Sequence, residues 1–246
     1  MKIAVLIAGQ PRFTKEFDHF FENLKNYDQL DFFFYLWTAR PADSKFIPPS
    51  WPLDKELVKE KLINTLPCYC NVARLEINDQ PGYTVPDTIQ RNPWSNPFNM
   101  WYNSYSIKQA NLLREQHNVE YDLVIRARAD MGLNTPVDIK HIHNFIMENP
   151  NSLVLPDNHR NGLGVVCNDM FAIGKSETIS IYCNAVDNFE LYHSQGVPYH
   201  PETLLGHHLN TNKIAYPLIG IQLISREYQE PKGCANPIVI DHGRWL

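Results

Sequence analysis

Runs of apolar residues alternate with amphipathic stretches along most of the chain, which is the pattern of strands joined by helices. The first apolar run, Lys2 to Ala8, ends at Gly9, and the second, Asp31 to Thr38, is rich in phenylalanine. Near-continuous apolar runs of this length are typical of strands buried on both faces of a parallel sheet. Between them, apolar residues at helical spacing predict a helix from about Lys15 to Asn26, with Thr14 as its N-cap.

The same alternation continues along the chain to about residue 225. It predicts these further helices: one capped by Asp54 that runs through Asn64, Phe98 to His117, Ile139 to Met147, one capped by Ser176 that runs to about Phe189, and Pro201 to about Asn210. It predicts these further strands: Asn71 to Ile77, Tyr121 to Arg128, Ser152 to Leu155, Asn168 to Gly174, and Ile219 to Ser225. Strands separated by helices favour parallel pairing. We therefore expect a single α/β domain over residues 1–246, with a mainly parallel central sheet flanked by helices. The neighbouring strands of this sheet are expected to be Lys2–Ala8, Asp31–Thr38, Asn71–Ile77 and Tyr121–Arg128.

The most informative stretch is YDLVIRARAD, residues 121–130, where an apolar run turns into Arg126, Arg128 and Asp130 at alternate positions. Alternate residues of a strand share a face, so two cations and a carboxylate are expected to converge as this strand leaves the sheet. The carboxyl edge of an open α/β sheet is where such folds bind ligands. Guanidinium groups bind phosphate oxygens, and a carboxylate holds a divalent cation. The alternative is a structural Arg–Asp ion pair that closes the strand end.

A turn of four residues, Gly9, Gln10, Pro11 and Arg12, follows the first strand and precedes the first predicted helix. Backbone N–H groups at a helix N-terminus, with an arginine beside them, form a common anion site. A glycine between a strand and a helix is also a common structural feature, so the turn alone does not identify a ligand.

Composition narrows the class of protein. The 246 residues are 43% hydrophobic and 20% charged, with a formal net charge of -5, which argues against a nucleic-acid binder. The opening apolar run is too short for a secretory signal or a membrane span. Five cysteines without paired CxxC spacings favour free thiols in a reducing compartment, and hence a cytoplasmic protein without a transmembrane segment.

Several segments together carry a resemblance to a known family. They are KIAVLIAGQPRF, FFFYLWT, WYNSYSIKQANLLRE, YDLVIRARAD, NDMFAIG and PETLLGHHL, in this order from Lys2 to Leu209. This set resembles polysaccharide-biosynthesis glycosyltransferases with a GT-A-like fold. The resemblance implies transfer of a sugar from a nucleotide-diphosphate donor to a hydroxyl of a glycan or glycoconjugate acceptor. It also implies that the Gly9–Arg12 turn lies against the nucleotide.

By the same resemblance, Asp130 stands where the last aspartate of a DxD motif coordinates Mn²⁺ or Mg²⁺ on the diphosphate. Here that motif reads Arg128-Ala129-Asp130, so a guanidinium replaces the first carboxylate. Two readings stay open. Either a divalent cation neutralises the diphosphate through Asp130, or Arg126 and Arg128 neutralise it directly, as in metal-independent transferases.

Two acidic residues are candidates for the base that an inverting transfer requires. Glu202 opens the helix of PETLL, which resembles the acidic motif of the acceptor-side helix in inverting members, and Asp169 begins a strand. The structural alternatives are that Glu202 only complements the helix dipole and that Asp169 only caps a turn.

Histidines late in the chain are candidates for a metal ligand, a role that the resemblance implies for one of them. His207, His208 and His242 are available, and His208 is the one we assign. Neighbouring residues on a helix point about 100° apart, so at most one of His207 and His208 faces a site. The alternative is that these histidines are solvated at the surface.

Two other functions compete with the transferase. LIAGQPRFTK is distantly similar to the glycine-, arginine- and lysine-containing loop of sugar-phosphate nucleotidyltransferases, although it contains only Gly9 where that loop is glycine-rich. The replaced carboxylate of the DxD motif also suits a nucleotide- or carbohydrate-binding protein of the same fold without catalysis.

Overall fold

The structure is a computed structural model that describes residues 1–11, 16–38, 54–79, 82, 84–87, 89, 96–156, 167–217, 221 and 223–225. The helices among them are α1 (Glu16–Asn23), α2 (Lys55–Thr65), α3 (Pro97–Glu115), α4 (Ile139–Glu148), α5 (Ser176–Cys183), the 3₁₀ helix η1 (Asn184–Asn188), α6 (Phe189–Ser194) and α7 (Pro201–Thr211). The strands are β1 (Lys2–Gly9), β2 (Leu24–Lys25), β3 (Gln29–Trp37), β4 (Cys70–Asn78), β5 (Leu123–Ala127), β6 (Met131–Leu133), β7 (Val137–Asp138), β8 (Leu153–Val154), β9 (Ala172–Gly174) and β10 (Leu223–Ser225).

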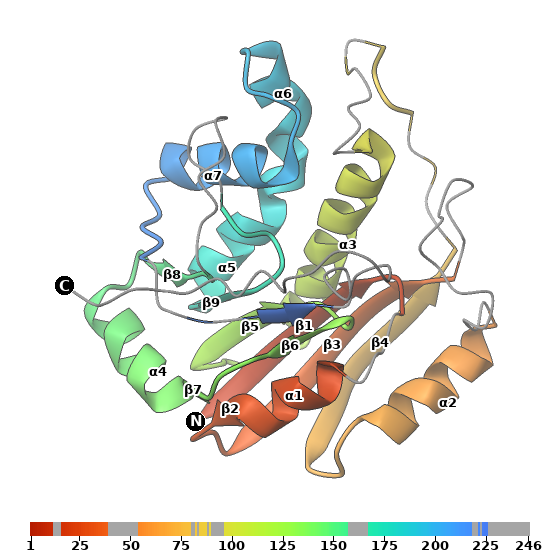
Figure 1. The fold of residues 1–246 in the computed structure, drawn as a ribbon, viewed down its shortest axis with the longest axis vertical. Coiled ribbons are helices and arrows are strands. Elements are labelled where there is room, and N and C mark those ends of the chain that lie inside the picture. Colours follow the sequence, from red (N-terminus) through yellow and green to blue (C-terminus); the bar gives the residue numbers. More distant parts are fainter. Residues whose placement is uncertain are drawn as a thin grey trace, which may run out of the picture.

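A six-stranded sheet in the order β4-β3-β1-β5-β9-β8 forms the centre of the molecule (Figure 1). β4, β3, β1 and β5 are neighbours and pair in parallel, as the sequence predicts for these four strands. β9 pairs antiparallel with both β5 and β8, so the expectation of a mainly parallel sheet is confirmed only for the four-strand half. No crossover helix is described between β8 and β9, and parallel pairing requires one. The protein is therefore α/β with a mixed sheet.

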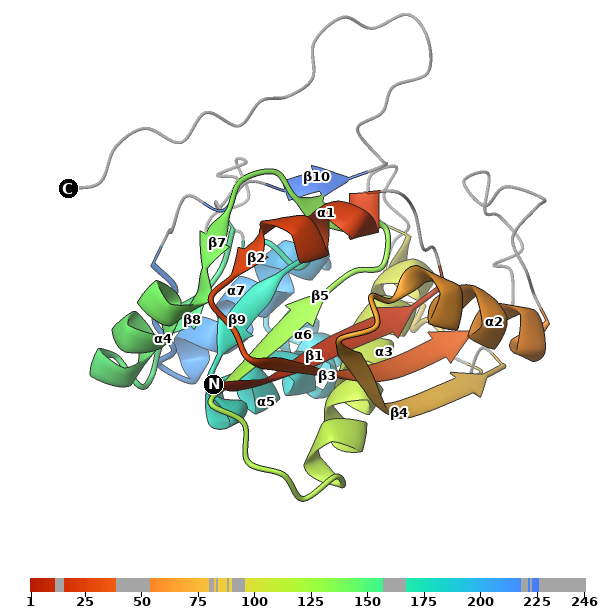
Figure 2. The same ribbon diagram turned by 90° about the horizontal axis from the view of Figure 1, so that it is seen from below.

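Helices cover both faces of this sheet, and the alternation of side chains along β1 shows how. Ile3, Val5 and Ile7 pack into a core with α1, α2 and α4. Ala4 and Leu6 point the other way, into a second core with α3, α5, η1, α6 and α7. Figures 1 and 2 show these two groups of helices on opposite sides of the strands. Because both faces are covered, β1 reads as a continuous apolar run.

Several predicted element ends differ from the structure for local reasons. The predicted strand from Asn168 begins only at Ala172, because the Asn168 side chain accepts a hydrogen bond from the Met170 N–H (2.8 Å) and forms a turn. Ser176 does not cap α5: it is the first helical residue, and Lys175 holds the N-cap position without a side-chain hydrogen bond. The predicted helix is divided, because α5 ends at Cys183 and η1 covers Asn184–Asn188, and α6 extends it to Ser194. Asp54 does cap α2, as predicted, by accepting from the Glu56 and Leu57 N–H groups.

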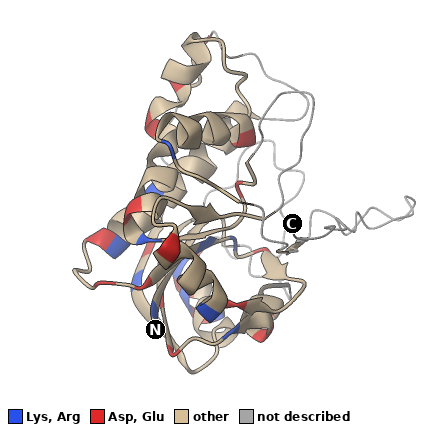
Figure 3. Cartoon of the chain, turned by 90° about the vertical axis from the view of Figure 1, so that its left-hand side faces the viewer, with Lys and Arg blue, Asp and Glu red and all other residues tan. Residues whose placement is uncertain are grey.

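Acidic and basic residues intermingle along the helices and strand ends in Figure 3, and neither sign dominates the part of the chain coloured there. Within the described residues, no helix combines the length and the apolar character that crossing a bilayer would require. Cys68, Cys70, Cys167 and Cys183 are free thiols, as expected, and Cys234 lies outside the described residues. The single domain over residues 1–246 and the cytoplasmic location stay predictions.

Candidate functional site

The turn after β1 and the turn after β5 lie at the same edge of the sheet. β1 and β5 are parallel neighbours, with Ile7 opposite Ala127, so both strands end at this carboxyl edge. Gly9 has φ +100°, which an L side chain rarely adopts, and a Cβ there would lie 3.5 Å from the Trp37 Nε1 at the end of β3. The prediction that both turns lie at one sheet edge is confirmed for Gly9–Pro11, and the diphosphate that they were expected to enclose stays a prediction. Pro11 is buried beside Gln10, whereas Arg12 lies outside the described residues.

Arg128 and Asp130 form a bidentate ion pair directly after β5. Arg128 Nε donates to Asp130 Oδ1 at 2.8 Å, and Arg128 Nη2 donates to Oδ2 at 2.7 Å. The Asp130 side chain is 7% exposed. The prediction that these two side chains lie on one face is confirmed. Their arrangement matches the alternative given above, a structural Arg–Asp ion pair that closes the strand end.

Arg126 occupies a different environment, because its side chain is 1% exposed. Its Nε, Nη1 and Nη2 atoms are buried and make no hydrogen bond with any residue that the structure describes. The guanidinium lies near the Tyr182 hydroxyl and the Cys183 thiol of α5. Burial raises the pKa of both groups, that of Cys183 to about 12, and the positive charge of Arg126 opposes the rise. An uncompensated buried cation is costly in a protein interior.

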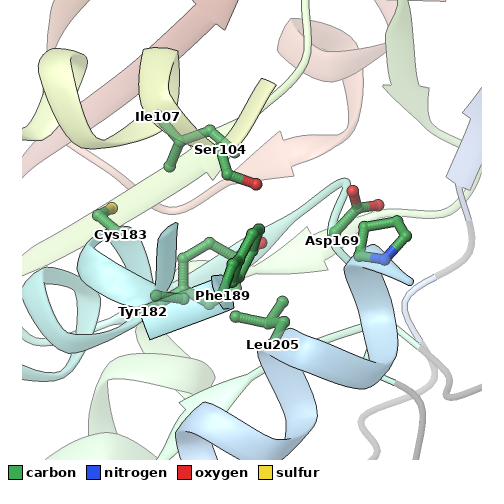
Figure 4. A pocket seen from close by; sticks show the side chains of 9 residues that line it. Ser104, Ile107, Asp169, Tyr182, Cys183, Phe189 and Leu205 are labelled. Carbon is green, nitrogen blue, oxygen red and sulfur yellow. The ribbon is translucent and has the colours of Figure 1, made fainter. Parts of the chain in front are cut away.

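A small pocket opens between α3, α5, η1 and the start of α7, on the side of the sheet that these helices cover (Figure 4). Its volume of about 20 Å³ accommodates roughly one water molecule or one hydroxyl group. Ser104 and Asp169 contribute its polar oxygens together with Tyr182, and Figure 4 shows Asp169 facing Ser104 across the opening. The Tyr182 hydroxyl is buried without a hydrogen-bond partner among the described residues.

Asp169 reaches this pocket because it lies just before β9, whose first residue, Ala172, pairs with Arg126. The Asn103 side chain of α3 donates to Asp169 Oδ2 at 3.4 Å. The candidate catalytic carboxylate therefore stands close to the end of β5, where sequence reasoning also placed the arginines. Its proposed role is not tested by this placement.

Glu202 lies in the first turn of α7 and pairs with a histidine that precedes the helix. His200 Nδ1 is 3.1 Å from Glu202 Oε2, and Thr203 Oγ1 lies 3.4 Å from the same nitrogen. Burial lowers the pKa of His200 from its ordinary value of 6.5, and the nearby Asp169 carboxylate opposes this shift. Glu202, Asp169 and His200 thus belong to one polar cluster beside the pocket.

His208 does not join that cluster. Its Nδ1 lies 2.9 Å from the Tyr192 hydroxyl and its Nε2 lies 2.9 Å from the Ile181 carbonyl oxygen, so both ring nitrogens are engaged. The ring is 4% exposed, and the alternative of a solvated surface histidine is wrong for this residue. This geometry does not suit the metal ligand that we assigned. His242 lies outside the described residues.

A divalent cation does not find an evident donor set here. Both carboxylate oxygens of Asp130 accept hydrogen bonds from Arg128. No group of three or more histidine, cysteine, aspartate or glutamate side chains able to hold a metal occurs within the described part of the chain. Among the described residues no ready set of ligands for a protein-held metal ion is present, and metal dependence stays a prediction.

Sequence reasoning missed His200, Tyr182 and Asn103. His200 and Glu202 are two positions apart across a helix start, a spacing at which an N-cap side chain meets the first turn, and this signal was available in the letters HPE. Tyr182 and Asn103 look like ordinary core and helix residues in sequence. Only the packing of α3 on α5 brings them to Asp169 and the pocket.

Comparison with known proteins adds no family assignment. No protein-family model matches the chain, and no curated protein matches it.

Proposed function

We propose that this protein is a glycosyltransferase that moves a sugar from a nucleotide-diphosphate donor to a hydroxyl of a glycan or glycoconjugate. The observation that carries the proposal is the presence of buried donors without partners at the ends of β3 and β5. These are the Trp37 indole N–H and the three guanidinium nitrogens of Arg126. Buried polar groups normally find partners, so groups left without one suggest a ligand that supplies acceptor oxygens.

A diphosphate suits these donors. Its oxygens accept hydrogen bonds, and its negative charge offsets the buried guanidinium. The Gly9–Pro11 turn lies next to Trp37 at the same edge, and open α/β sheets bind ligands at that edge. In this arrangement Arg126 neutralises charge that develops on the departing diphosphate. Arg128 contributes positive charge while Asp130 orients it.

The acceptor half of the proposal rests on the polar cluster beside the pocket. Asp169 and Glu202 lie on the side of the sheet to which Arg126 points. An acceptor hydroxyl held near these carboxylates would therefore face, from that side, a donor bound at the sheet edge. The pocket volume of about 20 Å³ leaves little room for water besides an acceptor hydroxyl, and water competes with the acceptor. Charge neutralisation, a proton acceptor and water exclusion are the three requirements of glycosyl transfer.

The test is a panel of nucleotide sugars incubated with the protein, with free nucleoside diphosphate as the readout. We expect slow hydrolysis of one donor, accelerated by a hydroxyl-bearing acceptor. Turnover that depends on pyrophosphate would instead identify a sugar-phosphate nucleotidyltransferase. Binding without turnover would identify a binding protein of this fold.

A further inference from the structure

The strand at one end of the central sheet, β4, has no neighbour on its outer side among the described residues. It is the first strand in the order β4-β3-β1-β5-β9-β8, and it pairs only with β3. Figures 1 and 2 show it at the margin of the sheet. β4 is nine residues long, Cys70–Asn78, and contains no proline, the residue that often prevents pairing at an edge. Its outer backbone groups can therefore accept another strand.

Arg74 and Glu76 occupy alternate positions of this strand and share one face. The register between β3 and β4 shifts where Ala73 is an extra residue, and it is regular from Arg74 onward. Arg74 lies opposite Phe33 and Glu76 lies opposite Tyr35, and both aromatic residues belong to the core that α3 covers. The two charged side chains therefore lie on the α3 face of the sheet, one beside the other along the edge.

These two charges are exposed, and neither forms an ion pair with a residue that the structure describes. Arg74 makes no hydrogen bond within that part of the chain, and Glu76 accepts one from the Asn78 side chain at 3.3 Å. An edge that presents a cation and then a carboxylate is complementary to a strand that presents them in the reverse order. A second copy of β4 that runs antiparallel to the first has this reverse order.

Exposed apolar side chains are concentrated around the same edge. The described residues expose six large hydrophobic side chains, and four of them lie on α2 or at the beginning of β4. These four are Leu57, Ile63, Tyr69 and Val72. α2 is the helix that leads into β4. Exposed apolar side chains that gather in one region are typical of a surface that contacts another protein.

We propose that this protein forms a two-fold symmetric dimer in which β4 pairs antiparallel with β4 of a second copy, with Leu75 at the symmetry axis. In this register Arg74 of each copy lies opposite Glu76 of the other, so two ion pairs form, one on each side of the axis. A register centred on Arg74 or on Glu76 would place like charges opposite each other. The charges therefore select the register as well as the second copy.

The faces of the two sheets agree with this pairing. A two-fold axis perpendicular to the sheet keeps the α3 faces of both copies on one side, and directly opposed residues of antiparallel strands point to the same side. Arg74 and the opposed Glu76 thus come within reach of each other on the α3 face. Leu75 points to the other face, because it lies opposite Phe34 and packs against the core of α1, α2 and α4. The two six-stranded sheets join into one continuous sheet.

The first test reverses the charges and measures the dimer by analytical ultracentrifugation over a range of concentrations. The wild type should show a reversible monomer–dimer equilibrium. Arg74→Glu should raise the Kd of the dimer by about tenfold or more, because two attractive contacts become two repulsive ones, and Glu76→Arg should do the same. The double variant, Arg74→Glu with Glu76→Arg, should restore the dimer, since its charges are again complementary. The matched control is Lys140→Glu on α4, which changes the net charge as Arg74→Glu does and should leave the Kd unchanged.

The second test locates the contact through amide hydrogen exchange. Backbone N–H groups that point outward from β4 exchange readily in the monomer and become hydrogen-bonded in the dimer. We expect the peptide that contains Arg74–Asn78 to exchange more slowly in concentrated than in dilute wild-type protein. Arg74→Glu should show no such dependence on concentration at the same two dilutions. Thermal unfolding should give equal midpoints for the variants and the wild type, because both substituted side chains are exposed.

Three results would overturn the proposed dimer. The first is a wild-type protein that stays monomeric up to its solubility limit. The second is a dimer that forms without protecting the amides of β4, since it would use another surface. The third is loss of the dimer in both single variants without recovery in the double variant, because self-complementary pairing of Arg74 with Glu76 requires that recovery.

Discussion

At the scale of single residues, the molecule contains two buried arginines with opposite surroundings. Arg114 is 5% exposed and donates to the Asn111 side chain at 2.9 Å and to Ser180 at 3.0 Å, with Glu115 at 3.3 Å. Arg126 is 1% exposed, and none of its guanidinium nitrogens has a partner in the described residues. The first is a satisfied structural network, and the second carries a cost that a ligand would relieve.

This contrast predicts that replacing Arg126 has different effects on stability and on ligand binding. Arg126→Met should leave the free energy of unfolding unchanged or raise it by about 1–4 kcal/mol, because an apolar side chain of similar length replaces an uncompensated charge. The same variant should bind nucleoside diphosphate more weakly, by about 1.5–3 kcal/mol. Urea denaturation and calorimetry measure the two effects. Arg114→Met is the control, and its stability should fall by about 3–5 kcal/mol without a change in binding. A large loss of stability in Arg126→Met would mean that Arg126 is structural.

Asp130 is expected to contribute more to stability than an exposed carboxylate would. A solvent-facing carboxylate contributes little to stability, but this one is buried and held twice by Arg128. Asp130→Asn leaves a partly buried guanidinium with one neutral acceptor, so we expect the free energy of unfolding to fall by about 1–3 kcal/mol in urea denaturation. A stability equal to that of the wild type would show that the pair is not what holds the turn after β5.

At the scale of elements, α7 is tied to its neighbours through one histidine. His208 contacts Tyr192 of α6 and the Ile181 carbonyl of α5. Burial lowers the pKa of this imidazole below its ordinary value of 6.5; the Ile181 carbonyl and Asp187 oppose the shift, and His207 adds to it. Below about pH 6.5, the His208 imidazole therefore binds a proton in the unfolded chain, whereas in the folded state it stays neutral to a lower pH.

The resulting stability is present above pH 6.5 and is lost as the pH falls below it, toward the lowered pKa of the folded state. We expect the urea midpoint of the wild type to drop between pH 7.5 and pH 5.5. His208→Gln should be less stable at pH 7.5 but should lose less on acidification. Equal losses in the two proteins would show that other groups control the acid response.

The short strands β8 and β9 depend on a close approach at Gly174. A Cβ there would collide with the Leu153 Cδ2 and would lie 2.7 Å from the Thr178 Oγ1. Gly174→Ala should therefore cost about 1–3 kcal/mol in thermal or urea unfolding, through overpacking between β8, β9 and α5. Gly82→Ala is a suitable control, because a Cβ at Gly82 meets no atom within 4 Å. Its effect should stay within about 0.5 kcal/mol.

At the scale of the whole molecule, the sequence predicts the parallel half of the sheet better than the antiparallel half. β1, β3 and β5 are buried along almost their whole length, so their composition predicts both strand and parallel pairing. β8 and β9 have two and three residues and carry no periodicity that distinguishes the direction of pairing. The residues of the candidate site also differ in how well the sequence could place them. Gly9, Arg128 and Asp130 follow long strands and could be placed at an edge, whereas Tyr182 and Asn103 reach the pocket through helix packing alone.

The proposed donor and acceptor halves of the site come from different parts of the chain, and ligand-induced stabilisation can separate them. A nucleoside diphosphate at about 100 times its Kd should raise the free energy of unfolding of the wild type by about 2.7 kcal/mol. Thermal unfolding should show this rise in His200→Gln, whose change lies on the acceptor side, and should show little of it in Arg126→Met.

The same measurement, made with Mn²⁺ and with excess chelator, shows which positive charge offsets the diphosphate. The sequence left two candidates open, a divalent cation at Asp130 and the arginines Arg126 and Arg128. Since Arg128 already engages both oxygens of Asp130, we expect the stabilisation to persist in chelator, with the arginines offsetting the diphosphate charge. Stabilisation that requires Mn²⁺ would mean that the ion binds together with the donor and that Asp130 exchanges its arginine for the metal. In that case, chelator would remove the ligand-induced stabilisation of the wild type as completely as the Arg126→Met substitution does.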